Sequence, residues 1–167
     1  MSKPTVYVDA NIVSIRYYRG GDPQALKEQL ATREWWEHER PFFELFASRA
    51  VESELAAGEY DGQERALAEV RKLPFLAGNT TVRDIVNKLL AAHVVPAAVP
   101  VDALHLAFAT VHSVDYLLSW NRAHLVSEET KRKLARFRAA FGVRTPLIVS
   151  PDSIPKAALG EDIRRRD

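Results

Sequence analysis

The sequence predicts an α/β fold, a three-layer α/β/α sandwich around a central, mostly parallel sheet. Two short runs, TVYV at residues 5–8 and YLLS at 116–119, are dominated by apolar residues and do not alternate, which is typical of strands buried on both faces. Longer segments with helical periodicity separate the candidate strands, as crossovers between parallel strands require. The 167 residues suffice for one domain, so we expect a domain over residues 1–150 and a loosely held tail over 151–167.

The N-terminal half is expected to contain the first two strands and four helices. In chain order these are a strand at 5–8, helices at 12–18 and 23–39, a strand at 42–47, and helices at 50–57 and 63–72. Asp22 and Ser48 precede helices that their side-chain oxygens are placed to cap. Leu26, Leu30 and a tryptophan form an apolar face of the helix at 23–39, opposite its charged residues, which predicts that this face packs inward.

The C-terminal half repeats the alternation of strands and helices. In chain order we expect a strand at 73–76, helices at 80–92 and 103–111, a strand at 116–119, a helix at 128–141 and a strand at 146–149. Thr80 or Thr81 is expected to cap the first of these helices, and Gly142 to end the last.

The composition excludes several classes of protein. The chain has no cysteine, which excludes disulfides, thiolate metal sites and a cysteine nucleophile, and fits a cytoplasmic protein. No apolar stretch reaches the roughly 20 residues of a membrane helix, and no secretory signal opens the chain. The net charge of +1 predicts that any contact with nucleic acid is local. No glycine-rich phosphate loop follows the first strand, which argues against a nucleotide-binding domain.

Polar side chains follow or flank the predicted strands. Asp9 comes directly after the first strand, Glu54 lies on the helix after the second, Asp102 opens a helix, and Asn121 follows the strand at 116–119. Because the carboxyl ends of parallel strands share one edge of the sheet, these side chains are expected to meet there. Neighbouring carboxylates repel one another unless a hard cation lies between them. The pattern therefore predicts a Mg²⁺ or Mn²⁺ site built from carboxylates.

Each of these residues also has an ordinary structural role. Asp9 is placed to cap the next helix, and Asn121 to cap the turn after its strand. Asp102 in a first helical turn favours the helix dipole. Glu54 is a common type of exposed helix charge. Glu52 is the rival of Glu54 as a ligand. The two lie about 200° apart on one helix and cannot share a face, so only one of them can be the ligand.

Four blocks of sequence resemble the PIN-domain family, the fold of VapC-type toxins and related ribonucleases. The resemblance covers residues 6–125 and rests on the following blocks: VYVDAN at 6–11, SRAVESELAAGE at 48–59, VDALHLAFAT at 101–110 and VDYLLSWNRAHL at 114–125. The third and fourth blocks are the most specific. The resemblance implies a metal-dependent endoribonuclease that uses Mg²⁺ or Mn²⁺ and acts on RNA. It also implies a homodimer and a small antitoxin as a partner.

The resemblance assigns the three acids of the site to Asp9, Glu54 and Asp102, and the small hydroxyl at the last strand's end to Ser119. Many family members carry a fourth acid where this chain has Asn121, so we expect one well-held ion. This departure keeps open a PIN-like binding module with weak or no catalysis. Supporting roles are expected for other residues near the site: Asn11 beside Asp9, His105 one turn after Asp102, and Arg16 and Arg19 beside the RNA.

Overall fold

The computed structural model describes residues 2–156 and contains a sheet of four parallel strands. The strands are β1 (Thr5–Val8), β2 (Glu44–Phe46), β3 (Tyr116–Leu118) and β4 (Leu147–Val149). Their order across the sheet is β2-β1-β3-β4, which places β1 and β3 at the centre. Tyr7, Leu117 and Leu118 on these central strands are fully buried. The parallel sheet that the continuous apolar runs predicted is therefore confirmed.

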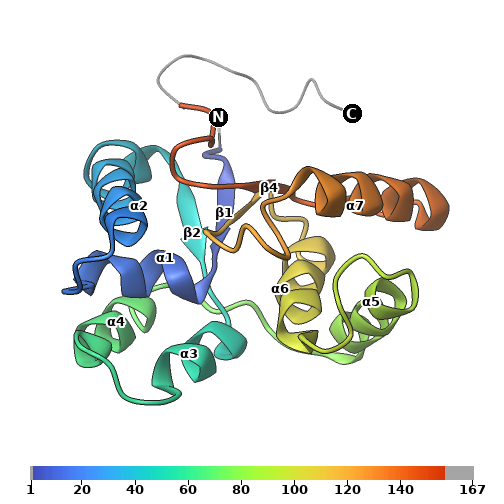
Figure 1. Cartoon of the computed structure of the whole chain (residues 1–167). Helices are drawn as coiled ribbons and strands as arrows, with labels where there is room; N and C mark the ends of the chain where they lie inside the picture. The colour runs from blue at the N-terminus through green and yellow to red at the C-terminus, as the bar shows by residue number, and fades with distance from the viewer. Residues whose placement is uncertain (1, 157–167) are drawn as a thin grey trace.

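Helices cover the sheet on both sides and make the three layers of the predicted sandwich (Figure 1). On one side lie α1 (Ala10–Ser14) and α2 (Pro23–Glu34). On the other lie α5 (Thr80–Ala91), α6 (Pro100–Val111) and α7 (Glu128–Phe141). The pair α3 (Arg49–Ala56) and α4 (Gln63–Val70) packs against α1 near the ends of β1 and β2. Three short turns complete the fold: η1 (Ile15–Tyr17), η2 (Trp35–Glu39) and η3 (Arg40–Phe42).

Capping residues explain where most of these helices begin and end. Asp22 accepts a hydrogen bond from Ala25 N at the start of α2, and Ser48 accepts from the first turn of α3, as predicted. Gly142, with φ of +63°, ends α7 in the left-handed conformation. The cap of α5 is Asn79, and neither Thr80 nor Thr81, so that prediction was wrong. Asn79 is an equally good capping residue and lies one residue before Thr80, so the helix begins one residue earlier than a Thr80 cap would allow.

The strand predicted at 73–76 is also wrong. Only one parallel bridge forms there, between Ala47 and Phe75. The bridge lies just beyond the edge strand β2, and Pro74 interrupts the segment without an N–H group to donate. The sheet described for residues 2–156 therefore ends at β2 on this side.

The predicted burial of Leu26 and Leu30 is wrong as well. Their exposed fractions are 43% and 63%, and α2 instead turns polar residues inward. Gln29 donates its amide to the backbone oxygens of Ile15 and Tyr18, which lie at the start of η1 and just after it. Thr32 accepts from Trp120 Nε1 at 2.8 Å. Helix α2 is thus anchored by hydrogen bonds that a simple count of apolar residues does not detect.

The chain after β4 turns back onto the domain before the described part ends. Ser150 and Ser153 hydrogen-bond to each other, and Ile154 is buried. Residues 157–167 of the predicted tail lie outside the described residues. Within residues 2–156, none of the helices combines the length and apolar character that a membrane span requires.

Candidate metal centre

Asp9 lies at the junction of β1 and α1 and is 3% exposed. Its backbone N–H still donates to Leu118 O on β3, so the sheet fixes its position. Its Oδ1 accepts from Ala10 N at 2.7 Å and caps α1. The carboxylate therefore combines the capping role with a place at the carboxyl edge of the two central strands.

Ser119 and Asn11 hold the second oxygen of this carboxylate. Ser119 Oγ donates to Asp9 Oδ2 at 2.7 Å, and Asn11 Nδ2 donates to the same oxygen at 3.1 Å. Asn11 Oδ1 in turn accepts from the backbone N–H of Trp120 at 2.9 Å, just beyond β3. Both residues predicted to support the site thus contact Asp9, and they connect the ends of β1 and β3.

Glu54 reaches the same edge from α3, whereas Glu52 turns away. The Glu54 carboxylate hydrogen-bonds to His105 Nε2, and its side chain is 35% exposed. Glu52 pairs with Arg71 Nε at 3.0 Å on the outer surface. The two acids are separated by the helical rotation that the sequence predicted, and only Glu54 faces the site.

His105 on α6 lies between Asp9 and Glu54 and is completely buried. Its Nε2 is 3.5 Å from Asp9 Oδ1, and its Nδ1 is 2.7 Å from the hydroxyl oxygen of Tyr7. That hydroxyl also lies 2.7 Å from Ser48 Oγ, the cap of α3. A chain of hydrogen bonds therefore runs from the start of α3 through β1 and α6 to Glu54.

Asp102 lies in the first turn of α6, is 3% exposed, and has partners on both carboxylate oxygens. Asn121 Nδ2 donates to Oδ1 at 3.2 Å, and His124 Nδ1 lies 3.0 Å from Oδ2. The Asn121 backbone N–H donates to Ser119 Oγ at 3.0 Å. One network of hydrogen bonds thus connects Asp102 with Asp9 through Asn121 and Ser119.

The charges in this network affect one another strongly. Burial, followed by the negative charge of Asp9, raises the pKa of Asp102 above its ordinary value, although His124 opposes the shift. Burial acts to lower the pKa of His105, but its hydrogen bond to Glu54 and the charges of Asp9, Glu54 and Asp102 outweigh it and raise that pKa. Burial also raises the pKa of Tyr7, so its hydroxyl stays protonated. The centre is a buried cluster of carboxylates that attracts positive charge.

The donor atoms fit a divalent cation. Asp9, Glu54 and His105 each offer one ligand atom, and the three atoms lie within 4.8 Å of one another. Ligands about 2.1 Å from one ion are separated by no more than about 4.2 Å on opposite sides of it, so small side-chain movements suffice. The donors come from three separate elements, β1, α3 and α6, which the fold brings to one edge.

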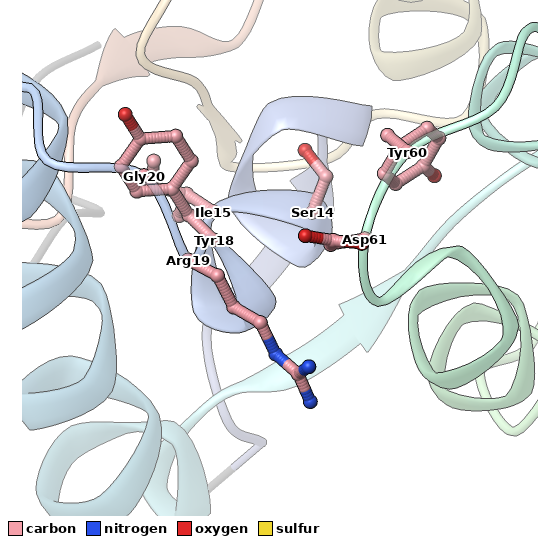
Figure 2. Close-up of a pocket in the computed structure, with 7 residues that line it drawn as sticks. All are labelled: Ser14, Ile15, Tyr18, Arg19, Gly20, Tyr60 and Asp61. Atoms are coloured by element: carbon pink, nitrogen blue, oxygen red, sulfur yellow. The ribbon is translucent and has the colours of Figure 1, made fainter.

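The predicted RNA contacts Arg16 and Arg19 lie in different surroundings. Arg16 stacks over the ring of Trp36 at 4.2 Å and pairs with Glu69, with only 18% of its side chain exposed. Arg19 is exposed and lines a hollow with Tyr18 and Tyr60 (Figure 2). The figure shows Tyr18 and Tyr60 on opposite sides of this hollow, with Ser14 of α1 between them. Arg16 is thus committed to a packed cluster, and Arg19 is accessible to a ligand.

Sequence reasoning missed the contact between His124 and Asp102 and the part played by Tyr7. The spacing of His124, three residues after Asn121, was the available signal, because Asn121 Oδ1 caps the turn by accepting from His124 N. For Tyr7 the signal was a hydroxyl on a fully buried strand, where it needs a hydrogen-bond partner. Asp115, directly before β3, pairs with Thr5 and Arg144 at the opposite end of the strands and takes no part in the site.

No protein-family model matches the chain. No curated protein matches it. Among solved structures, the chain is similar to one in the crystal structure of VapBC2 from Rickettsia felis bound to a DNA fragment from their promoter. The two share 10% identity over 87% of this chain and 98% of that chain, with a TM-score of 0.47. Function must therefore be inferred from the residues of this chain.

Proposed function

We propose that the chain is a PIN-type, divalent-metal-dependent endoribonuclease that hydrolyses RNA phosphodiester bonds. The observation that carries the proposal is the meeting of three acids at one edge of the parallel sheet. Asp9 and Asp102 share one hydrogen-bonded network, and His105 Nε2 contacts both Glu54 and Asp9. The four blocks of sequence that resemble PIN-domain ribonucleases support the choice of reaction. The site residues in the proposal are those three acids together with Asn121.

The chain's own residues position the acids. Asp9 is held by Ser119 and Asn11, so its oxygens keep one orientation. Glu54 is the more exposed acid and closes the site from α3. A divalent cation bound among them would lower the pKa of water and offset the charge that develops on the phosphate during hydrolysis.

The hollow in Figure 2 is the proposed path of the RNA. Two connections relate it to the site: α1 runs from Asp9 to Ser14, which lines the hollow, and Tyr60 donates its hydroxyl to Leu55 O, one residue after Glu54. Aromatic rings accept stacked bases of single strands, and an exposed arginine such as Arg19 contacts phosphate. We therefore assign Arg19, and not Arg16, to the RNA.

The test is RNA cleavage by purified variants in the presence of Mn²⁺. Asp9→Asn, Glu54→Gln and Asp102→Asn should each lower the cleavage rate by more than about 100-fold, since even groups outside the first ligand shell are worth 10–100-fold. Glu52→Gln is the matched control on the same helix and should cleave normally. Circular dichroism checks that each variant folds. Normal cleavage by folded Asp9→Asn and Asp102→Asn proteins would exclude the nuclease.

A PIN-like binding module is the second candidate, favoured by the hydrogen bonds of Asn121. Its neutral amide adds no charge to the site, and its oxygen already accepts from His124 N while its nitrogen donates to Asp102. Calorimetric titration with Mn²⁺ separates the candidates. Micromolar binding that a chelator abolishes favours the enzyme, and absence of binding favours the module.

The homodimer and the antitoxin are proposed from the resemblance alone. Light scattering coupled to size exclusion tests for the dimer. Co-expression with the product of a short adjacent reading frame tests for the antitoxin, which should co-purify with the chain and suppress its cleavage of RNA. Failure of either test leaves the nuclease proposal in place, because the site described above lies within one chain.

A further inference from the structure

Only Nε2 of the His105 ring contacts the carboxylates, and the rest of the ring is buried. The residue is fully buried, and its Nε2 contacts Glu54 and lies 3.5 Å from Asp9 Oδ1. Adjacent ligand atoms of an octahedral ion with bonds of about 2.1 Å are about 3.0 Å apart, and opposite ones about 4.2 Å, so the second distance lies between these values. A small movement would therefore bring His105 and Asp9 to the spacing of a pair of ligands.

The other ring nitrogen is fixed by a buried hydroxyl. When Nδ1 carries the proton, it donates to Tyr7 Oη, and the Tyr7 hydroxyl donates to Ser48 Oγ. Nε2 then turns its lone pair toward the acids. Metal-binding histidines characteristically donate their second N–H to an outer group that fixes the ring in this way. Tyr7 supplies this outer group here.

Asp102 is less suited than His105 to complete the compact set of donors. Its Oδ1 accepts from Asn121, and its Oδ2 contacts His124 Nδ1 at 3.0 Å. The three ligand atoms within 4.8 Å of one another belong to Asp9, Glu54 and His105. Glu54 lies too close to His105 for both to bind one ion as they stand, but its side chain is 35% exposed and has room to turn.

We propose that His105 Nε2 is a direct ligand of the cation, together with Asp9 and Glu54, and that the centre prefers divalent transition ions to Mg²⁺. The preference follows from the nitrogen donor, because imidazole suits ions such as Fe²⁺ and Zn²⁺, whereas Mg²⁺ selects oxygen ligands. Mn²⁺ stands between these two groups and serves as the spectroscopic probe. This inference rests on the proposed function in one respect, that a cation binds at this edge of the sheet.

Pulsed electron paramagnetic resonance of the Mn²⁺-loaded protein tests the inference directly. The wild-type chain should show coupling of Mn²⁺ to a histidine nitrogen, and His105→Gln should lose it. His124→Gln is the matched control, since His124 lies at Asp102, and it should keep the coupling. Bound Mn²⁺ without nitrogen coupling in the wild-type chain, or coupling that persists in His105→Gln, overturns the inference.

Two further variants keep the test decisive if His105→Gln does not fold. A chain in which His38, His93, His112 and His124 are all glutamine retains His105 as its one histidine and should keep the nitrogen coupling. Tyr7→Phe removes the hydroxyl on Nδ1 and should weaken Mn²⁺ binding by about 10-fold. Loss of the coupling in the first chain, or unchanged Mn²⁺ affinity in Tyr7→Phe, counts against His105 as a ligand.

Calorimetry separates failure of this inference from failure of the proposed function. Mn²⁺ should bind the wild-type chain more tightly than Mg²⁺, and the preference should shrink in His105→Gln. Equal affinities for the two ions overturn the transition-ion preference but leave the nuclease standing. Absence of binding by either ion overturns both, because no cation then binds at this edge.

Discussion

Asn121 Nδ2 donates a hydrogen bond of 3.2 Å to Asp102 Oδ1. The orientation of the amide is fixed from its other side, where Asn121 Oδ1 accepts from the backbone N–H of His124 at 3.0 Å. Asn121 thus meets a buried carboxylate with a donor. The effect of placing an acid at this position can be predicted.

Asn121→Asp replaces the donor with a second negative charge against Asp102. Loss of the hydrogen bond to a buried group costs about 1–3 kcal/mol, so the metal-free variant should melt about 5 °C lower. Mn²⁺ should recover much of the difference by offsetting the added charge. Asn79→Asp is the matched control, because it adds the same charge at a helix cap where Asp is equally favourable. Thermal melts with Mn²⁺ and with chelator provide the measurement, and an unchanged gap between the two conditions would contradict the prediction.

Ser119→Ala should destabilise the fold and weaken the centre together. Ser119 Oγ donates to Asp9 and accepts from Asn11 and from the backbone of Asn121, so its removal leaves buried polar groups without a partner. The expected loss is about 1–3 kcal/mol in the free energy of unfolding. Ser53→Ala, on the exposed side of α3, should change it by less than about 0.5 kcal/mol. Chemical denaturation of both variants measures the difference, and equal losses would show that Ser119 has no special role.

The metal-free protein should lose stability as the pH rises above 6.5. The pKa of His105 is raised in the folded chain, mainly because Glu54 and Asp9 outweigh the opposing effect of burial. A raised folded pKa means that the folded state binds the proton more tightly, so this stabilisation is complete below the unfolded pKa of about 6.5 and is lost as the pH rises through the folded value. The pKa of Asp102 is also raised, so its contribution to stability is likewise lost as the pH rises, but in a lower range that begins above its ordinary pKa of 3.8.

Bound Mn²⁺ should remove this decline, because metal ligands bind in their deprotonated forms. Melting temperatures measured across the pH range with chelator and with Mn²⁺ check both statements. His105→Gln should abolish the part of the decline that lies above pH 6.5. A metal-free melting temperature that rises through this range would refute the assignment.

Arg19→Ala should raise the KM for RNA several-fold and change kcat little, because a phosphate contact at the hollow binds ground state and transition state alike. The salt dependence of RNA binding should fall by about 0.7 in the slope of log affinity against log salt, the value for one contact with a single strand. Arg136→Ala removes the same charge from α7, on the other side of the sheet, and is the control. Equal effects in the two variants would show that RNA binding depends on the net charge of the chain and not on a contact with Arg19.

Local signals in the sequence were sufficient to predict most of the fold. The run from Thr5 to Val8 and the cap at Ser48 correspond to β1 and to the start of α3. The failures have a common cause in long-range contacts. Gln29 and Thr32 anchor α2 through partners on η1 and after β3, which left Leu26 and Leu30 at the surface.

For the site, the sequence placed the acids together and assigned His105 a supporting role, but it did not predict which acids His105 and His124 contact. Asp9 and Asp102 could be placed because strand ends and first helical turns are visible in the pattern. The contacts of His105 with Glu54 and of His124 with Asp102 join residues 51 and 22 positions apart. The first pair meets because α6 packs against α3, and the second because the chain turns after β3. The periodicity of apolar residues in the sequence does not predict either contact.

Asp9 completes a strand, caps a helix and joins the cluster of acids, so its loss disturbs folding and chemistry together. Glu54 has no comparable structural duty, since it projects from a surface helix with its side chain part exposed. If the proposed cleavage of RNA were no longer under selection in a lineage of such proteins, inactivating substitutions would accumulate first at Glu54. A descendant that had become a silent binder would then keep the aspartate of the first strand and lack the glutamate.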